Sequence, residues 1–344
     1  ADTYTTTKPK SITYVLKNGS DFNKLIPSNA TAIVFCYDKA PSGATIIDVD
    51  ADGDGGVVAW MEGATAKVST QTLGIKVQAN ADCTNMFRDR GNSGSDVSPS
   101  ALDDSDMQVY GGASTVLTSV DFTALDTSKT TNMSMMFYDC NGLTSVNVEN
   151  FATSNVTDMR GMFFSCKSLN SLDVSKFNTS NVTSMGGMFM SCNSLTSLDV
   201  SGFNTLNVNN MASMFNGCMT VDSLDVSKFN TSKVINMFSM FNGCTSLTSL
   251  DVSGFDTSNV TNMCGMFSDC SNLTSLDVSG FNTSNVTDMA DMFNYCSGLT
   301  SLDVSGFNTS KVTNMCGMFS DCSNLTSLDV SGFDTTNVTD MNCM

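Results

Sequence analysis

A row of aspartates recurs in this sequence at intervals of 26 residues, and their carboxylates could bind cations or hydrogen-bond to a ligand. Each one stands in the sequence Ser-Leu-Asp-Val-Ser, and Asn147 takes the equivalent place in the first repeat. Carboxylates roughly 5 Å apart repel by on the order of 1 kcal/mol per pair in water, and serine hydroxyls or Ca²⁺ would offset this repulsion. A solvated, serine-bonded face and a ligand-binding face both remain open. The residues of the row are Asp173, Asp199, Asp225, Asp251, Asp277, Asp303 and Asp329.

A second acidic group lies near the N-terminus, where residues 48–54 read D-V-D-A-D-G-D. This spacing matches the opening of an EF-hand calcium loop, in which alternate side chains supply oxygens to the ion. The twelfth position of such a loop carries a bidentate acid, but Ala59 stands there in this chain. A calcium site and a plain acidic turn therefore both remain open. The candidate ligands are Asp48, Asp50, Asp52 and Asp54.

Cysteine is the third residue type with reactive potential. Of 13 cysteines, eight share one place in the repeat, from Cys140 to Cys322. A buried thiol behaves as a small hydrophobic group, and this interpretation is favoured over disulfides between neighbouring repeats or a metal site. A spacing of 26 residues is unlike the Cys-x-x-Cys spacing of metal sites.

The sequence contains no histidine, which removes the commonest general base and the commonest metal ligand. No nucleophile–base constellation and no glycine-rich phosphate loop appears. We expect a protein that is not an enzyme and that has no catalytic residues. No cofactor is required, and Ca²⁺ is the candidate ion.

The elements that must position these residues follow from the 26-residue period. In one repeat, Met159, Met162, Phe163 and Cys166 form an apolar stripe at the spacing of a short helix. Residues 172–174 alternate as a short strand would. The sequence predicts an α/β solenoid with one short helix and one short parallel strand per repeat. Helices need more room than strands, so the strands and the aspartate row should line the concave face.

The repeat text TSNVTDMRGMF…C…L…SLDVSKF resembles the repeat of the BspA-like leucine-rich-repeat surface proteins of bacteria. The resemblance extends over about residues 125–344. It implies a right-handed coil of the leucine-rich-repeat kind. It also implies a cell-surface or secreted protein that is often linked to adhesion, and it carries over no catalytic residues.

The chain divides into three predicted parts. Residues 1–82 form a β-rich N-terminal domain or cap, with one or two helical turns near residues 21–26 capped by Ser20. Residues 83–124 form an irregular capping repeat with a loop insertion within 88–113. Residues 125–344 hold eight full repeats and a partial ninth. Strands are expected at 11–17, 32–37, 57–61, 67–70 and 75–78.

The net charge of −18 argues against a nucleic acid or an anionic membrane surface as partner. No apolar run is long enough to span a membrane. The start at Ala1 fits a mature end left by signal-peptide cleavage, or a trimmed chain, and secretion is favoured. The last residue, Met344, falls within a predicted helix, so we expect the natural chain to continue or this end to contact another molecule.

These observations predict a secreted or cell-surface bacterial protein that acts in adhesion or surface presentation. Its partner would be a host protein, a glycan, another cell, or further copies of the chain bound through the ends of the solenoid. The alternative is a structural subunit of an extracellular filament, sheath or stalk.

Overall fold

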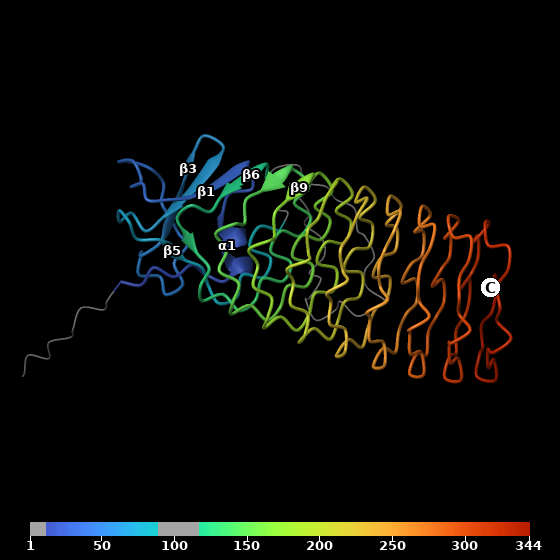
Figure 1. The fold of residues 1–344 in the computed structure, drawn as a ribbon. Helices are drawn as coiled ribbons and strands as arrows, with labels where there is room; N and C mark the ends of the chain where they lie inside the picture. The colour runs from blue at the N-terminus through green and yellow to red at the C-terminus, as the bar shows by residue number, and fades with distance from the viewer. Residues whose placement is uncertain (1–11, 89–116) are drawn as a thin grey trace, which may run out of the picture.

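The repeats of this chain cannot bury their apolar side chains singly, and they stack into a row of coils that share one core. A computed structural model describes residues 12–88 and 117–344. A five-stranded sheet and a helix stand at one end, and the coils run from there to the C-terminus (Figure 1). We call residues 125–344 the coil stack. The insertion expected within residues 88–113 lies, apart from Arg88, outside the described residues.

The N-terminal region forms a mixed sheet with the strand order β2-β3-β4-β1-β6. β1 pairs in parallel with β4 and β6, whereas β3 pairs in antiparallel fashion with β2 and β4. Because β6 comes from the region predicted as a capping repeat, the sheet joins that region to the N-terminal residues. The strands are β1 (Ala32–Cys36), β2 (Ile47–Asp48), β3 (Val58–Glu62), β4 (Thr65–Ser69) and β6 (Ser119–Asp121).

The helix α1 (Gly19–Leu25) starts earlier than the sequence predicts. Its N-cap is Asn18 rather than Ser20, since the Asn18 side chain accepts from the N–H of Asp21 at 2.9 Å. The helix lies close against the start of the coils. A Cβ at Gly19 would lie 2.4 Å from the carbonyl oxygen of Thr84, so this contact requires glycine.

The prediction of one short helix per repeat is wrong, because the described residues of the coil stack contain no α-helix. In the segment of each coil that was predicted to be helical, backbone N–H groups donate alternately to two kinds of partner. Those of Gly161 and Phe163 donate to carbonyls of the next coil at 2.9 Å, whereas that of Met162 donates to Met159 within a tight turn. A helix would send each N–H to the fourth preceding carbonyl instead.

Two residues with positive φ in each coil enforce this ladder of turns. Gly161 and Ser165 have φ of 57° and 61°, and the same pair recurs one coil later at Gly187 and Ser191. A right-handed helix cannot pass through left-handed residues at every fourth position. The predicted apolar stripe is nevertheless buried, and its members Met159, Met162, Phe163 and Cys166 are inaccessible to solvent.

The strand expected in each repeat forms only in part. β8 (Ser145–Val146) pairs in parallel with β9 (Ser171–Leu172), and β5 (Val77–Gln78) pairs with β7 (Leu125–Asp126). The described residues beyond β9 contain no assigned strand, and single parallel bridges join the coils there, such as that between Ser184 and Asn210.

The bridges and most hydrogen bonds between coils lie on the methionine side of the stack. We expected helices on this side to spread the coils and so to make the aspartate face concave. Because the described coils contain no helix, the structure gives no support to this argument.

One apolar core extends from Leu16 to Met318. A row of phenylalanine rings runs through it, beginning with Phe22 of α1 and Phe35 of β1, whose centroids are 6.0 Å apart. In the coils the rings lie nearly parallel, and those of Phe163 and Phe189 are 5.9 Å apart with planes 2° apart. The rings therefore link the N-terminal sheet to the coils in one continuous contact.

The cysteine row is part of this core. The thiol of Cys218 donates to the carbonyl oxygen of Phe189 at 3.3 Å, and that of Cys244 donates to Phe215 at 3.2 Å. All 13 thiols are free in the structure, and seven of the eight in the row are buried. Burial raises the pKa of Cys166 and of Cys218 to about 12. These groups act as small core side chains with one hydrogen bond each.

We expect Phe215→Ala to lower the free energy of unfolding by about 3–5 kcal/mol, because it opens a cavity in the ring stack. Chemical denaturation followed by circular dichroism would measure this. Leu206→Ala is the matched control, because Leu206 is 47% exposed and its loss should change the free energy by less than about 0.5 kcal/mol. Equal effects of the two substitutions would contradict the buried ring stack.

Alkylation of the folded protein by iodoacetamide at mildly alkaline pH should modify the exposed Cys343 first. The buried thiols from Cys140 to Cys296 should stay unmodified, because burial disfavours the thiolate that reacts. Peptide mass spectrometry would give the rate at each site, and the same reaction in concentrated guanidinium chloride is the control. Equal rates at Cys343 and Cys218 in the folded protein would show that the row is accessible.

Candidate functional site

The aspartate row lies on one exposed face of the coil stack. We call this the rung face and define it as the seven aspartates from Asp173 to Asp329 with the serines and leucines of the same segments. Each aspartate closes a short turn. Oδ1 of Asp199 accepts from the backbone N–H of Ser201 at 2.9 Å and from its hydroxyl at 2.7 Å. Within the described residues, no hydrogen bond to Oδ2 of Asp199 occurs, so this oxygen is available to solvent or a ligand.

Most coils have three places at which a side-chain oxygen accepts from the N–H two residues later; Ala152 and Ser184 are exceptions. Asparagine serves as well as aspartate at all three. On the rung face Asn147 forms this bond, after the phenylalanine both Asn204 and Asp256 form it, and at the bridge both Asn210 and Asp158 form it. The turn therefore does not require a carboxylate, yet the rung face has one in seven successive coils.

The rung face is hollowed along part of its length. A hollow of about 640 Å³ extends over four coils, with Asp173, Asp199, Asp225 and Asp251 among its lining residues. A second hollow, of about 440 Å³, reaches back to Asn147. The two share Leu172, Asp173 and Ser197, so they meet at this point. The leucines form an apolar part of the lining that the sequence alone did not associate with the acids.

Serine hydrogen bonds govern the charge of the rung face. The hydroxyl and the N–H of Ser201 lower the pKa of Asp199 below 3.8, although the neighbouring carboxylates of Asp225 and Asp173 act in the opposite direction. The pKa is lowered in the same way at Asp173, Asp225, Asp277, Asp303 and Asp329. These carboxylates are therefore charged at neutral pH and lie next to one another.

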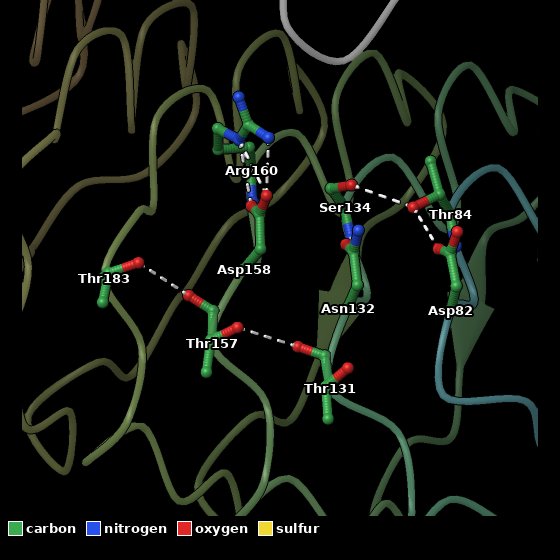
Figure 2. Close-up of polar contacts among 9 residues, drawn as sticks. All are labelled: Asp82, Thr84, Thr131, Asn132, Ser134, Thr157, Asp158, Arg160 and Thr183. Carbon is green, nitrogen blue, oxygen red and sulfur yellow. Dashed lines mark hydrogen bonds and ion pairs between the residues drawn. The ribbon is translucent and has the colours of Figure 1, made fainter.

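A threonine row on another surface has a structural role. The hydroxyl of Thr157 donates to the carbonyl oxygen of Thr131 at 3.2 Å, and that of Thr183 donates to Thr157 at 3.1 Å (Figure 2). Beside it, Arg160 forms an ion pair with Asp158 at 2.6 Å. These polar groups bind one another across or within coils, which leaves the rung face as the stronger candidate for recognition.

The acidic loop near the N-terminus connects β2 to β3. Residues 13–17, more than 30 residues earlier in the chain, hold it in place. The N–H of Thr13 donates to Oδ2 of Asp54 at 3.0 Å, and Nζ of Lys17 donates to the carbonyl oxygen of Asp50 at 2.6 Å. This upstream segment was predicted as a strand over residues 11–17, of which residue 11 lies outside the described part of the chain. It forms isolated bridges only, at Val15 and Leu16.

The loop brings together three of the four predicted calcium ligands. One carboxylate oxygen each from Asp50, Asp52 and Asp54 lie within 4.8 Å of one another. Asp48 is not part of this group; it is exposed in β2, and its Oδ1 accepts from the N–H of Asp50 at 2.9 Å. Three carboxylates at this distance could bind a cation.

Asp50 is the unusual member of the group. Its side chain is inaccessible to solvent, and its Oδ1 has no hydrogen-bond partner. Oδ2 accepts from the N–H of Asp54 at 3.0 Å. Burial, together with the neighbouring carboxyl groups of Asp52 and Asp54, raises the pKa of Asp50 from 3.8 to about 6. No sequence signal indicates this burial, since the covering segment is more than 30 residues away in the chain.

Among the described residues, no helix has the length and apolar character to cross a membrane.

Comparison with known proteins gives one family match and one similar solved structure. The family model described as "Mycoplasma protein of unknown function, DUF285" matches residues 106–223, 190–298 and 272–344. The crystal structure of a leucine-rich repeat protein from Eubacterium ventriosum is similar at 14% sequence identity and a TM-score of 0.35, covering 80% of this chain and 94% of that one. No curated protein matches this chain.

Replacing Ser201 by alanine should raise the pKa of Asp199 toward 3.8, because the hydroxyl that stabilises the carboxylate is lost. In the native protein the hydrogen bond stabilises the fold above pH 3.8, and this contribution is lost as the pH falls through the lowered pKa of Asp199. Carboxyl ¹³C chemical shifts measured as a function of pH would give the pKa. Ser197→Ala is the control, because Ser197 lies on the same rung and does not bond to Asp199. An unchanged pKa in Ser201→Ala would show that the serine does not set the charge.

Proposed function

The chain belongs to the DUF285 family, and from this premise we propose that it is a non-catalytic protein of the cell surface or the extracellular medium that acts in adhesion or surface presentation. In this proposal the coil stack is a right-handed solenoid of the leucine-rich-repeat kind. It holds the rung face as a long, stiff surface, and this surface binds the partner.

The observation that carries this proposal is the choice of aspartate over asparagine on the rung face. The turn accepts either residue, as Asn147 demonstrates, and the neighbouring carboxylates repel one another. Asparagine would close the same turn without that repulsion. A carboxylate kept in seven successive coils at this cost is best explained by a partner that it binds.

The chemistry of the hollow indicates the class of partner. Charged carboxylates, serine hydroxyls and a leucine lining suit an elongated ligand with repeated cationic or hydroxyl groups, such as a basic peptide segment or a glycan chain. The rungs are nearly identical, so they favour a repetitive ligand over a unique sequence. A bond to each successive rung would add to the binding through multivalency.

The double variant Asp199→Asn/Asp225→Asn should lower the affinity for the ligand by at least about tenfold, because each carboxylate loses charge-assisted hydrogen bonds. Binding would be measured on arrays of glycans and of extracellular-matrix proteins, and then by surface plasmon resonance with the best binder. Asparagine already occupies this place at Asn147, so the variant should fold normally.

The matched control is Asp256→Asn/Asp334→Asn, which also removes two negative charges but leaves the rung face unchanged. Sister coils carry asparagine at the place of Asp256, for example Asn204 and Asn230. Equal binding by both double variants would refute a role for the rung face. If no array component binds, and negative-stain microscopy shows fibres, the filament-subunit alternative would replace adhesion.

A further inference from the structure

We infer that the loop between β2 and β3 is a calcium site, with the carboxylates of Asp50, Asp52 and Asp54 as its side-chain ligands. This inference is independent of the proposed function, because the loop lies in the N-terminal sheet and the rung face lies on the coils.

The loop is fixed before any ion binds. The N–H of Ala51 donates to the carbonyl oxygen of Val15 at 2.8 Å, and the N–H of Lys17 donates to that of Val49 at 2.9 Å. Gly53 and Gly55 have φ of 70° and 78°, which lets the backbone reverse between the acids. The three carboxylates are therefore held together by the surrounding backbone, and the ion would not have to gather them.

The buried oxygen of Asp50 is the observation that points to a ligand. A carboxylate without access to solvent normally has a partner for each oxygen, because an unpaired buried charge is costly. Oδ1 of Asp50 has none, and a carboxylate oxygen of Asp50 lies within 4.8 Å of one from Asp52 and one from Asp54. In the described part of the chain, no ion pair includes Asp50 or Asp54. The ammonium group of Lys17, a cation close to the loop, donates to the backbone oxygen of Asp50 and not to a carboxylate.

The three clustered acids have the sequence spacing of a calcium loop that starts at Asp50. The structure groups Asp50-x-Asp52-x-Asp54-Gly55, which is again the Asp-x-Asp-x-Asp-Gly pattern but starts two residues later than the motif at Asp48. Asp48 then supports the loop, since its side chain accepts from the N–H of Asp50.

Calcium fits this group better than magnesium. Ca²⁺ accepts irregular sets of six to eight oxygens from carboxylates, carbonyls and water, whereas Mg²⁺ demands a near-ideal octahedron and keeps its water. In the new register the twelfth position is Met61, so the bidentate acid of tight sites is lacking. The affinity should therefore fall in the weak range of extracellular calcium modules, with a Kd of about 10⁻⁴–10⁻³ M.

The test uses the full chain with CaCl₂ as the probe. The melting temperature should rise by about 2–5 °C between excess EDTA and about 10 mM CaCl₂, and equilibrium dialysis with ⁴⁵Ca should detect binding. The variants Asp50→Asn and Asp52→Asn should both lose the shift and bind at least about tenfold more weakly. Asp52 is exposed, so its variant tests the site even if Asp50→Asn folds poorly.

Asp121→Asn is the matched control, with the same loss of charge on β6 of the same sheet, and it should behave as the native protein. In EDTA, Asp50→Asn should melt no lower than the native chain, because it removes a buried charge whose Oδ1 has no hydrogen-bond partner. Lack of calcium binding by the native chain, or an unchanged shift in Asp50→Asn and Asp52→Asn, would overturn the site. An equal shift with MgCl₂ would overturn the assignment to calcium.

Discussion

Contact in register between each residue and its equivalent one coil away is the constraint on which this structure depends. The N–H groups of Gly161 and Phe163 reach carbonyls of the next coil, while the intervening N–H groups close turns within their own coil. The backbone thus satisfies its hydrogen bonds without helices and with few strands. Once that register is set, like side chains must meet, and the phenylalanine rings, the cysteine thiols and the threonine hydroxyls all form rows. A core built in this way grows by adding coils and needs no larger radius.

The sequence predicted which residues of the coils are buried, but it did not predict their backbone conformation. Met159, Met162, Phe163 and Cys166 are buried as their spacing predicts. That spacing is typical of a helix, yet consecutive turns place the same residues inside. The deciding feature is positive φ at Gly161, Ser165 and their equivalents in other coils. Glycine and aspartate tolerate this conformation and give a weak signal of it, whereas serine gives none. The alternation of Leu172, Asp173 and Val174 was also correct, but pairing into a continuous sheet did not follow, because most hydrogen bonds between coils lie on the methionine side.

The two candidate sites differ in how much of them the sequence could predict. The rung face depends on a repeated local segment, so the exposure of the aspartates and their bonds to serine were open to prediction. The hollow and its leucine lining depend on how coils stack and were not. The acidic loop shows the limit more sharply. Its motif was visible, but the burial of Asp50 depends on a segment near Val15, and no local pattern connects the two.

In this chain, the position of negative charge distinguishes the residues that we propose to bind a partner from those that only stabilise the fold. Most coils have three turns closed by a side-chain oxygen, and at two of them asparagine and aspartate alternate from coil to coil, with Ala152 and Ser184 as exceptions. Those places show that the fold is indifferent to charge there. The rung face has aspartate in seven successive coils, although its carboxylates repel, and within residues 12–88 and 117–344 only the acidic loop buries an aspartate. The row of carboxylates and the buried aspartate both destabilise the fold, and neutral residues at the same places would not. Charge at places where neutral residues would serve the fold is therefore the physical feature on which both proposed sites rest.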